Sequence, residues 1–139
     1  MPPLSSESAD GELHPRAIVA GHGDFALGMV SAVGQITGRS ELLLPFSSVD
    51  LGREEIETGL REQLTRYHID VVFTDLPGGS ATFAARRLMR DIHPLTVVTG
   101  ANLATLIDFV FCDADHSTAD AARHAAEKGR AALVATSAG

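Results

Sequence analysis

Val19-Ala20-Gly21-His22-Gly23-Asp24-Phe25 is the stretch that decides the fold of this 139-residue chain. It follows an apolar run and precedes apolar residues at helical spacing, so it predicts a turn from a strand into a helix. In such a turn the His22 imidazole is exposed between two glycines at the positive end of a helix. Helix starts of this kind bind anions. We therefore expect Gly23, Asp24 and Phe25 to form a phosphate-binding turn and His22 to carry the reactive atom.

Strands and helices alternate along the rest of the chain. Expected strands lie at residues 17–21, 41–46, 70–74, 95–99 and 131–136, and expected helices at 24–37, 51–67, 80–93, 102–112 and 117–129. The alternation predicts an α/β three-layer sandwich with a mostly parallel, flavodoxin-like sheet in the order 2-1-3-4. In such a sheet, ligands bind where the strand order reverses, between the ends of the first and third strands. Those strands end at His22 and Asp75, so we expect these two residues to lie side by side.

Composition narrows the classes of partner and compartment. Residues 16–139 form one expected domain, whereas residues 1–15 are rich in Pro, Ser and acidic residues and predict a disordered tail. The net charge of −7 argues against a nucleic-acid partner. The single cysteine, Cys112, allows no internal disulfide, and no apolar run approaches the length of a membrane span. We expect a cytoplasmic protein.

The chemistry expected at the turns is nucleophilic attack by an imidazole. To attack phosphorus, His22 needs one bare ring nitrogen, and a carboxylate on the other nitrogen's proton fixes that tautomer. Asp75, at the end of the neighbouring strand, is the candidate for this role. No lysine or arginine lies in these turns, so the phosphoryl group must be held by backbone N–H groups and hydroxyls. Gly78, Gly79 and Ser80 supply them.

Two further residues are expected to support the site, Thr74 before the carboxylate and Asn102 at a third strand-to-helix turn. Taken singly, each turn has an ordinary interpretation as a glycine turn or a helix cap. Their convergence on neighbouring strand ends favours a site. Asp113, Asp115 and His116 make too loose a cluster for a metal, so we expect neither a metal nor a cofactor.

A nucleotide-binding module is a rival hypothesis, because Gly21, Gly23 and Ala26 also fit a dinucleotide fingerprint. Against it, no acidic residue clearly ends the second strand. A flavin site would favour flanking aromatics, which are scarce here. A receiver domain would require acids after the first strand and a late lysine. This chain has a histidine there, and its only lysine, Lys128, lies in the last expected helix.

The turns together resemble the enzyme IIA domain of the mannose-type sugar phosphotransferase system. The resemblance runs in order from about residue 17 to residue 133. The matching pieces are Val19-Ala20-Gly21-His22-Gly23-Asp24-Phe25-Ala26 with Gly28, Thr74-Asp75-Leu76 with Gly78-Gly79-Ser80, Ala84 and Ala85, and Gly100-Ala101-Asn102-Leu103 with Leu106.

The resemblance implies a phosphohistidine carrier. His22 would take a phosphoryl group from the histidine-containing phosphocarrier protein and pass it to an enzyme IIB component for sugar uptake. Asp75 would orient the imidazole and Ser80 would lie beside the phosphoryl group. The resemblance also implies a homodimer with an exchanged C-terminal strand, and membrane contact only through a transporter complex. A regulatory or orphan carrier, serving a sensor or a dihydroxyacetone-kinase-type system, is the alternative within the same fold.

The chain departs from the usual family pattern around these turns. Ala81, Thr82 and Phe83 replace a proline, an aromatic residue and an asparagine, Ala104 replaces a proline, and Pro77 stands where an aromatic residue is frequent. These changes flank the expected site and leave His22, Asp75 and Ser80 in place. They bear on the partner surface and the sugar pathway, which the sequence does not specify.

Overall fold

A four-stranded parallel sheet forms the middle layer of the molecule in the computed structural model, which describes residues 14–112 and 115–139. The strands are β1 (Ala17–Gly21), β2 (Leu43–Ser47), β3 (Val71–Thr74) and β4 (Thr96–Val98). They lie in the order β2-β1-β3-β4, and Val19 of β1 pairs with Pro45 on one side and with Phe73 on the other. The expected strand order is confirmed, and β1 and β3 are neighbours.

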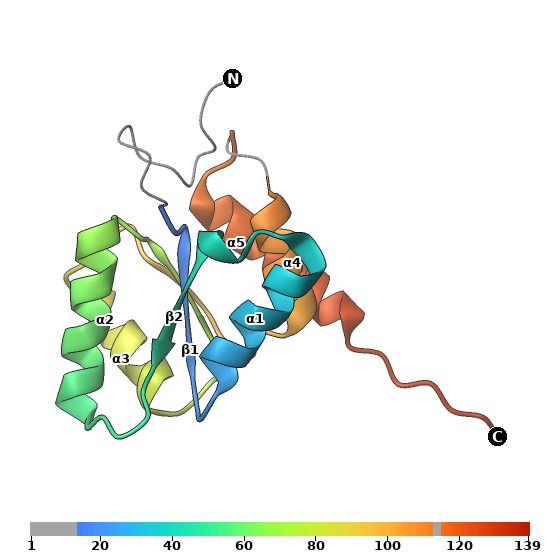
Figure 1. The fold of residues 1–139 in the computed structure, drawn as a ribbon, viewed down its shortest axis with the longest axis horizontal. Helices are drawn as coiled ribbons and strands as arrows, with labels where there is room; N and C mark the ends of the chain where they lie inside the picture. Colours follow the sequence, from blue (N-terminus) through green and yellow to red (C-terminus); the bar gives the residue numbers. More distant parts are fainter. Residues whose placement is uncertain (1–13, 113–114) are drawn as a thin grey trace.

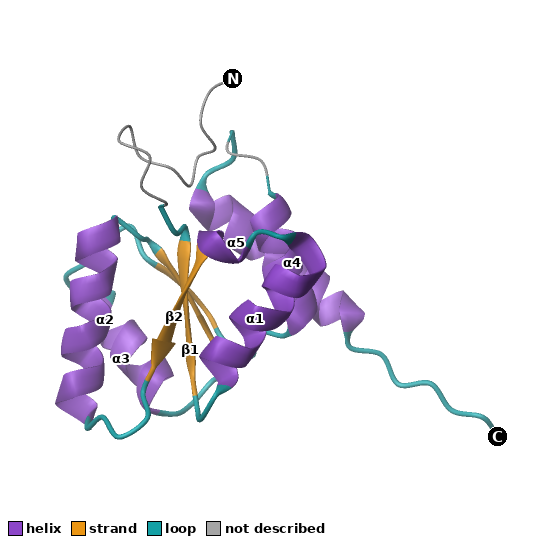
Figure 2. Cartoon of the chain, viewed as in Figure 1, coloured by secondary structure: helices purple, strands orange, loops and turns teal. Residues whose placement is uncertain are grey.

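Helices cover both faces of this sheet (Figure 1). One outer layer holds α1 (Phe25–Thr37), α4 (Leu103–Phe111) and α5 (Thr118–Ala132), and the other holds α2 (Arg53–Tyr67) and α3 (Ser80–Leu88). Figure 2 shows the same three layers, with the strands between the two groups of helices. The three-layer α/β sandwich expected from the sequence is confirmed.

Side-chain alternation along β1 explains the two cores. Ala17 and Val19 are fully buried against the α1, α4 and α5 layer, and Ile18 and Ala20 are fully buried against the α2 and α3 layer. Because successive residues of a strand point to opposite faces, a strand covered on both sides must be apolar throughout. Burying one large aliphatic side chain of this kind contributes about 1.5–3 kcal/mol.

Two helix ends illustrate how packing sets element boundaries. Gly38 ends α1 in the left-handed conformation, with φ 72°, as the sequence predicts. Gly129 does not end α5, which continues to Ala132. A Cβ on Gly129 would lie 1.9 Å from the Thr105 hydroxyl oxygen and 2.8 Å from the Asn102 side-chain oxygen. The glycine therefore serves the close approach of α5 to α4 rather than helix termination.

Two further expected boundaries and one expected strand were wrong. The second strand begins at Leu43, after a 3₁₀ turn at Ser40–Leu42, and the third helix ends at Leu88 rather than at residue 93. The expected strand at residues 131–136 is absent from this part of the chain: Ala131 and Ala132 extend α5, and residues 133–139 have no regular structure and lead away from the layers (Figure 1). A strand needs a paired neighbour, and an alanine-rich helix continues readily.

Of the expected tail at residues 1–15, residues 1–13 lie outside the described part of the chain, as does Asp113. None of the helices within residues 14–112 and 115–139 has the length and apolar character needed to cross a membrane. Within those same residues no three His, Cys, Asp or Glu side chains assemble as metal ligands.

Candidate functional site

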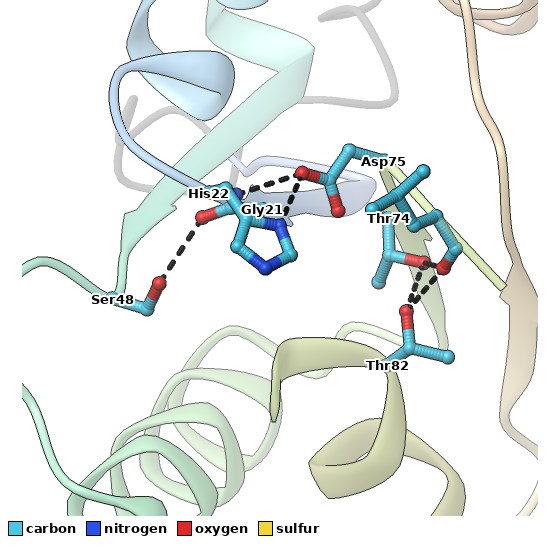
Figure 3. A network of polar contacts seen from close by, with 7 residues as sticks. Gly21, His22, Ser48, Thr74, Asp75 and Thr82 are labelled. Atoms are coloured by element: carbon cyan, nitrogen blue, oxygen red, sulfur yellow. Dashed lines mark hydrogen bonds and ion pairs between the residues drawn. The ribbon is translucent and has the colours of Figure 1, made fainter. Parts of the chain in front are cut away.

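His22 and Asp75 meet at the carboxyl ends of β1 and β3 (Figure 3). One Asp75 oxygen, Oδ2, lies 2.8 Å from the His22 ring nitrogen Nδ1 and also 2.8 Å from the His22 backbone nitrogen. Because an ionised carboxylate only accepts hydrogen bonds, this contact assigns the proton of the neutral imidazole to Nδ1 and leaves Nε2 with a free lone pair. The two-point contact fixes both the ring and the backbone of His22.

The two side chains of the pair differ in their accessibility to solvent. The His22 side chain is 63% exposed, and the Asp75 side chain is 13% exposed. Burial of the Asp75 carboxyl favours its neutral form. The hydrogen bonds from the His22 backbone and imidazole favour the ionised form, as does the positive charge of the imidazole when it is protonated. Together these interactions outweigh the effect of burial. The pKa of Asp75 therefore lies below its usual value. Asp75 is an ionised anchor, and His22 faces solvent.

Gly21 and Gly23 make the close approach of the dyad sterically feasible. A Cβ on Gly21 would lie 2.7 Å from the Asp75 carboxyl carbon and 2.7 Å from the Phe25 ring. Gly23 has φ +51°, in the left-handed region that favours glycine. The turn is closed by a hydrogen bond from the Phe25 N–H to the His22 carbonyl oxygen, at 3.0 Å. The glycine pair thus brings the imidazole against the carboxylate.

The Nε2 side of the imidazole faces the start of α3. A Cβ on Gly79 would lie 2.8 Å from His22 Cε1 and 3.3 Å from Nε2, and Gly79 has φ +98°. Ser80, the first residue of α3, lines a hollow of about 110 Å³ together with His22 and Ser48. The first N–H groups of a helix have no partner within the helix and carry partial positive charge. This arrangement can hold an anion next to Nε2.

Hydroxyl groups brace the loop that carries Asp75. Thr82 Oγ1 lies 2.7 Å from Thr74 Oγ1 and 2.6 Å from the Leu76 carbonyl oxygen, and both threonines are buried (Figure 3). On the other side, the Ser48 hydroxyl donates to the Gly21 carbonyl oxygen at 3.1 Å. Thr74 and Thr82 therefore hold the loop that carries Asp75, and Ser48 holds the end of β1.

The remaining expected residues are placed as follows. Asp24 occupies the cap position of α1 but makes no side-chain cap hydrogen bond, so its carboxylate is exposed beside the turn. Gly78 lies between Asp75 and Gly79, near the Phe83 ring. Asn102 does not join this cluster: its side chain caps α4 through Thr105 and donates to the Gly129 carbonyl oxygen at 2.8 Å. The third turn is part of the α4–α5 packing.

Ser48 and Thr82 were missed at the sequence level. Ser48 directly follows β2, and the carboxyl ends of neighbouring parallel strands meet at one edge of a sheet. That rule could have placed Ser48 beside His22. Thr82 is one of the residues at which the chain differs from the usual family pattern. Its hydrogen bond to Thr74 depends on how α3 packs on β3. Local sequence carries no signal for that contact.

The fold and the dyad define a class of protein: a doubly wound α/β domain that presents a carboxylate-held histidine at its strand ends. Residues 16–127 match the family model described as the PTS system fructose IIA component, so the chain belongs to this family of phosphotransferase-system IIA components. The resemblance expected from the sequence is confirmed. No curated protein matches the chain.

Solved structures support the same fold. The mannose/sorbose-specific IIA subunit from Enterococcus faecalis is 22% identical with a TM-score of 0.74, over 91% of this chain and 98% of that one. The PTS IIA protein associated with the fucose utilization operon from Streptococcus pneumoniae is 20% identical with a TM-score of 0.75, over 88% and 93%. The EIIA component from Streptococcus agalactiae is 21% identical with a TM-score of 0.72, over 86% and 95%.

Proposed function

We propose that this chain is a phosphohistidine carrier of a sugar phosphotransferase system. In this proposal His22 accepts a phosphoryl group on Nε2 from the histidine-containing phosphocarrier protein and passes it to a histidine of an enzyme IIB component. One observation carries the proposal: Asp75 holds Nδ1 of the exposed imidazole at 2.8 Å, and the Cε1–Nε2 edge of the ring faces Gly79 at the start of α3. Family membership supports the phosphotransferase role.

The transfer step needs no proton exchange at His22. The Nε2 lone pair attacks phosphorus, a new N–P bond forms, and the donor's N–P bond breaks with its electron pair returning to the donor imidazole. The positive charge that develops on the His22 ring is stabilised by the Asp75 carboxylate. Transfer to the acceptor histidine is the same step in reverse. Both halves depend on positioning and charge stabilisation rather than on acid–base chemistry.

The phosphoryl group would be held by the backbone around Gly79 and Ser80 and by the Ser80 hydroxyl. These groups lie at the positive end of α3 and on the Nε2 side of the ring. Gly23 and Gly78, in the flanking turns, let the backbone come close to the bound anion. No metal or cofactor takes part in the proposed step. The carrier would work in the cytoplasm, beside the proteins that supply and take its phosphoryl group.

We also propose that the functional unit is a homodimer. Leu133 and Val134 are 85% and 73% exposed at the start of the segment 133–139, and β4 forms the edge of the sheet. An apolar segment beside an open sheet edge suits strand exchange between two copies. Sedimentation at micromolar concentration is expected to give a dimer that becomes a monomer when residues 133–139 are removed. A full-length monomer would contradict this part of the proposal.

The carrier role is tested by charging and discharging the protein. Enzyme I, the phosphocarrier protein and radiolabelled phosphoenolpyruvate should load the chain with a label that is stable in base and labile in acid, as a phosphoramidate is. The purified labelled chain should then lose its label to an enzyme IIB component. Absence of loading would contradict the carrier role. Loading without discharge to enzyme IIB would contradict the transport role and favour the regulatory alternative.

A further inference from the structure

We propose that the Ser48 hydroxyl binds the phosphoryl group carried by His22, as a second hydroxyl ligand beside that of Ser80. Ser48 directly follows β2 and lies across the imidazole from Asp75 (Figure 3). The phosphoryl group would thus be held between the loop after β2 and the start of α3. The proposal rests on the proposed function, because it concerns the group that His22 is proposed to carry.

The hollow that contains His22 offers an anion neutral donors rather than charged ones. Its volume is about 110 Å³, and neither lysine nor arginine is among its lining residues within the described part of the chain. Apart from the imidazole, its polar side chains are those of Ser48 and Ser80, and its other lining residues are glycine or aliphatic. A phosphoryl group in such a place is held by N–H and O–H donors. The two serines are therefore the side chains of the hollow that can donate an O–H hydrogen bond to it.

The hydrogen bond that Ser48 makes in the unphosphorylated protein is long. Its hydroxyl donates to the Gly21 carbonyl oxygen at 3.1 Å, whereas Thr82 Oγ1 lies 2.6 Å from the Leu76 carbonyl oxygen. Distances between a donating hydroxyl and an accepting oxygen are usually about 2.5–3.0 Å. The bond between Ser48 and Gly21 is therefore weaker than the hydroxyl bonds that brace the Asp75 loop.

A bound phosphoryl group is a stronger acceptor than the Gly21 carbonyl oxygen. Hydrogen bonds from a hydroxyl to an ionised oxygen are roughly twice as strong as those between neutral groups. The Ser48 hydroxyl has one proton, so it donates to one acceptor at a time, and it rotates about its Cβ–Oγ bond. When His22 is phosphorylated, this O–H is expected to turn from the Gly21 carbonyl oxygen to a phosphoryl oxygen.

The backbone on both sides of this switch is already fixed. The Leu51 N–H donates to the Ser48 carbonyl oxygen at 3.1 Å, which closes the turn that presents Ser48. The His22 N–H donates to Asp75 Oδ2 at 2.8 Å, so the peptide between Gly21 and His22 keeps this anchor when its carbonyl loses Ser48. Only a hydroxyl has to rotate, and little conformational entropy is lost when the phosphoryl group is bound.

The equilibrium of phosphoryl exchange tests this assignment. Ser48→Ala should lower the equilibrium constant for transfer from the phosphocarrier protein to His22 roughly tenfold, because one charge-assisted hydrogen bond to the product is lost. This constant compares the free proteins, so the affinity of docking does not enter it. Ser47→Ala is the matched control and should leave it unchanged, since Ser47 is exposed and its hydroxyl accepts from the Val49 N–H at 3.4 Å. Equal constants for the wild type and Ser48→Ala, or an equal loss in both variants, would overturn the proposal.

The carbonyl carbon of Gly21 distinguishes a phosphoryl ligand from a residue that only holds the end of β1. Without phosphorylation, its NMR chemical shift should differ between the wild type and Ser48→Ala, because Ser48 donates to that carbonyl in the wild type. In the phosphorylated proteins this difference should disappear, since the Ser48 hydroxyl has turned away. A difference that persists after phosphorylation would show that Ser48 only holds the strand end, against the proposal.

Labelling of the wild type separates this proposal from the proposed function. If enzyme I, the phosphocarrier protein and radiolabelled phosphoenolpyruvate leave the wild type unlabelled, the proposed function fails, and the Ser48 assignment fails with it. If the wild type is labelled and Ser48→Ala has the same equilibrium constant, the carrier role stands and the Ser48 assignment alone is wrong.

Discussion

Two histidine–carboxylate pairs of nearly the same geometry occur in this molecule, one at the ends of β1 and β3 and the other between α4 and α5. In the first, His22 Nδ1 is 2.8 Å from Asp75 and the side chains are 63% and 13% exposed. In the second, His124 Nδ1 is 2.7 Å from Asp108 and the side chains are 60% and 20% exposed. Ring contact and accessibility therefore do not distinguish them, and the difference must lie in what surrounds each ring.

The backbone around the two histidines supplies that difference. His22 ends a strand, its N–H also binds Asp75, and its ring faces Gly79 and the start of α3. His124 lies in the middle of α5, where N–H groups bond to carbonyl oxygens of the same helix, and Asp108 lies on α4. A histidine–carboxylate pair orients an imidazole in either place. Only the first pair has free backbone donors on the side where a phosphoryl group would sit.

Removal of each carboxylate charge gives the largest expected contrast. Asp75→Asn should lower the rate of phosphoryl transfer roughly 10²–10⁴-fold, because the amide does not stabilise the charge that develops on the ring. Asp108→Asn should leave the rate unchanged. Rapid-quench measurements with the phosphocarrier protein as donor give both rates. Equal effects of the two substitutions would remove the distinction between the pairs.

Filling the space beside Nε2 should have the next largest effect. Gly79→Ala would place a Cβ 2.8 Å from His22 Cε1 at a residue with φ +98°, so it should slow transfer and lower the free energy of unfolding by about 1–3 kcal/mol. Gly28→Ala is the matched control, because a Cβ there meets nothing within 4 Å and α1 gains helix propensity of up to about 1 kcal/mol. Urea denaturation and transfer rates measure both. Unimpaired transfer in Gly79→Ala would show that the approach of Gly79 is unimportant.

Lowering the pH should reduce the contribution of the His22–Asp75 pair to the free energy of unfolding. Because the pKa of Asp75 is lower in the folded protein than its usual value of 3.8, the folded state binds fewer protons than the unfolded state in acid. The stabilisation is fully present above that usual value and is lost as pH falls through the folded pKa. Urea unfolding between pH 7 and pH 3 should therefore show a smaller acid loss in Asp75→Asn than in the wild type. An identical loss would contradict the assignment.

The smallest expected effect concerns the helix that carries Asp108. Ala104 is the second residue of α4, where a missing N–H costs little, so Ala104→Pro should stabilise the protein by about 0.4–1 kcal/mol through the unfolded chain. Phosphorylation of His22 should not change, because no residue of α4 lines the hollow that contains His22. A thermal melt and a transfer assay check both points. A clearly lower melting temperature would show that the turn before α4 does not tolerate proline.

Much of the fold could be predicted from the sequence, because apolar strands alternate with helices. Open parallel sheets of this kind also adopt only a few strand orders. The neighbouring positions of His22 and Asp75 followed from the same rule. Contacts between elements were not accessible. The roles of Thr82, Gly129 and Asn102 depend on how helices pack, and the expected strand at residues 131–136 was wrong because Ala131 and Ala132 continue α5.

The central claim is that His22, and not His124, carries the phosphoryl group. The most direct measurement is parallel labelling of the wild type, His22→Ala and His124→Ala with enzyme I, the phosphocarrier protein and radiolabelled phosphoenolpyruvate. Both histidines are exposed, so neither substitution should disturb a buried core. We expect wild-type label in His124→Ala and none in His22→Ala. Label that persists in His22→Ala, or disappears in a folded His124→Ala, would contradict the account.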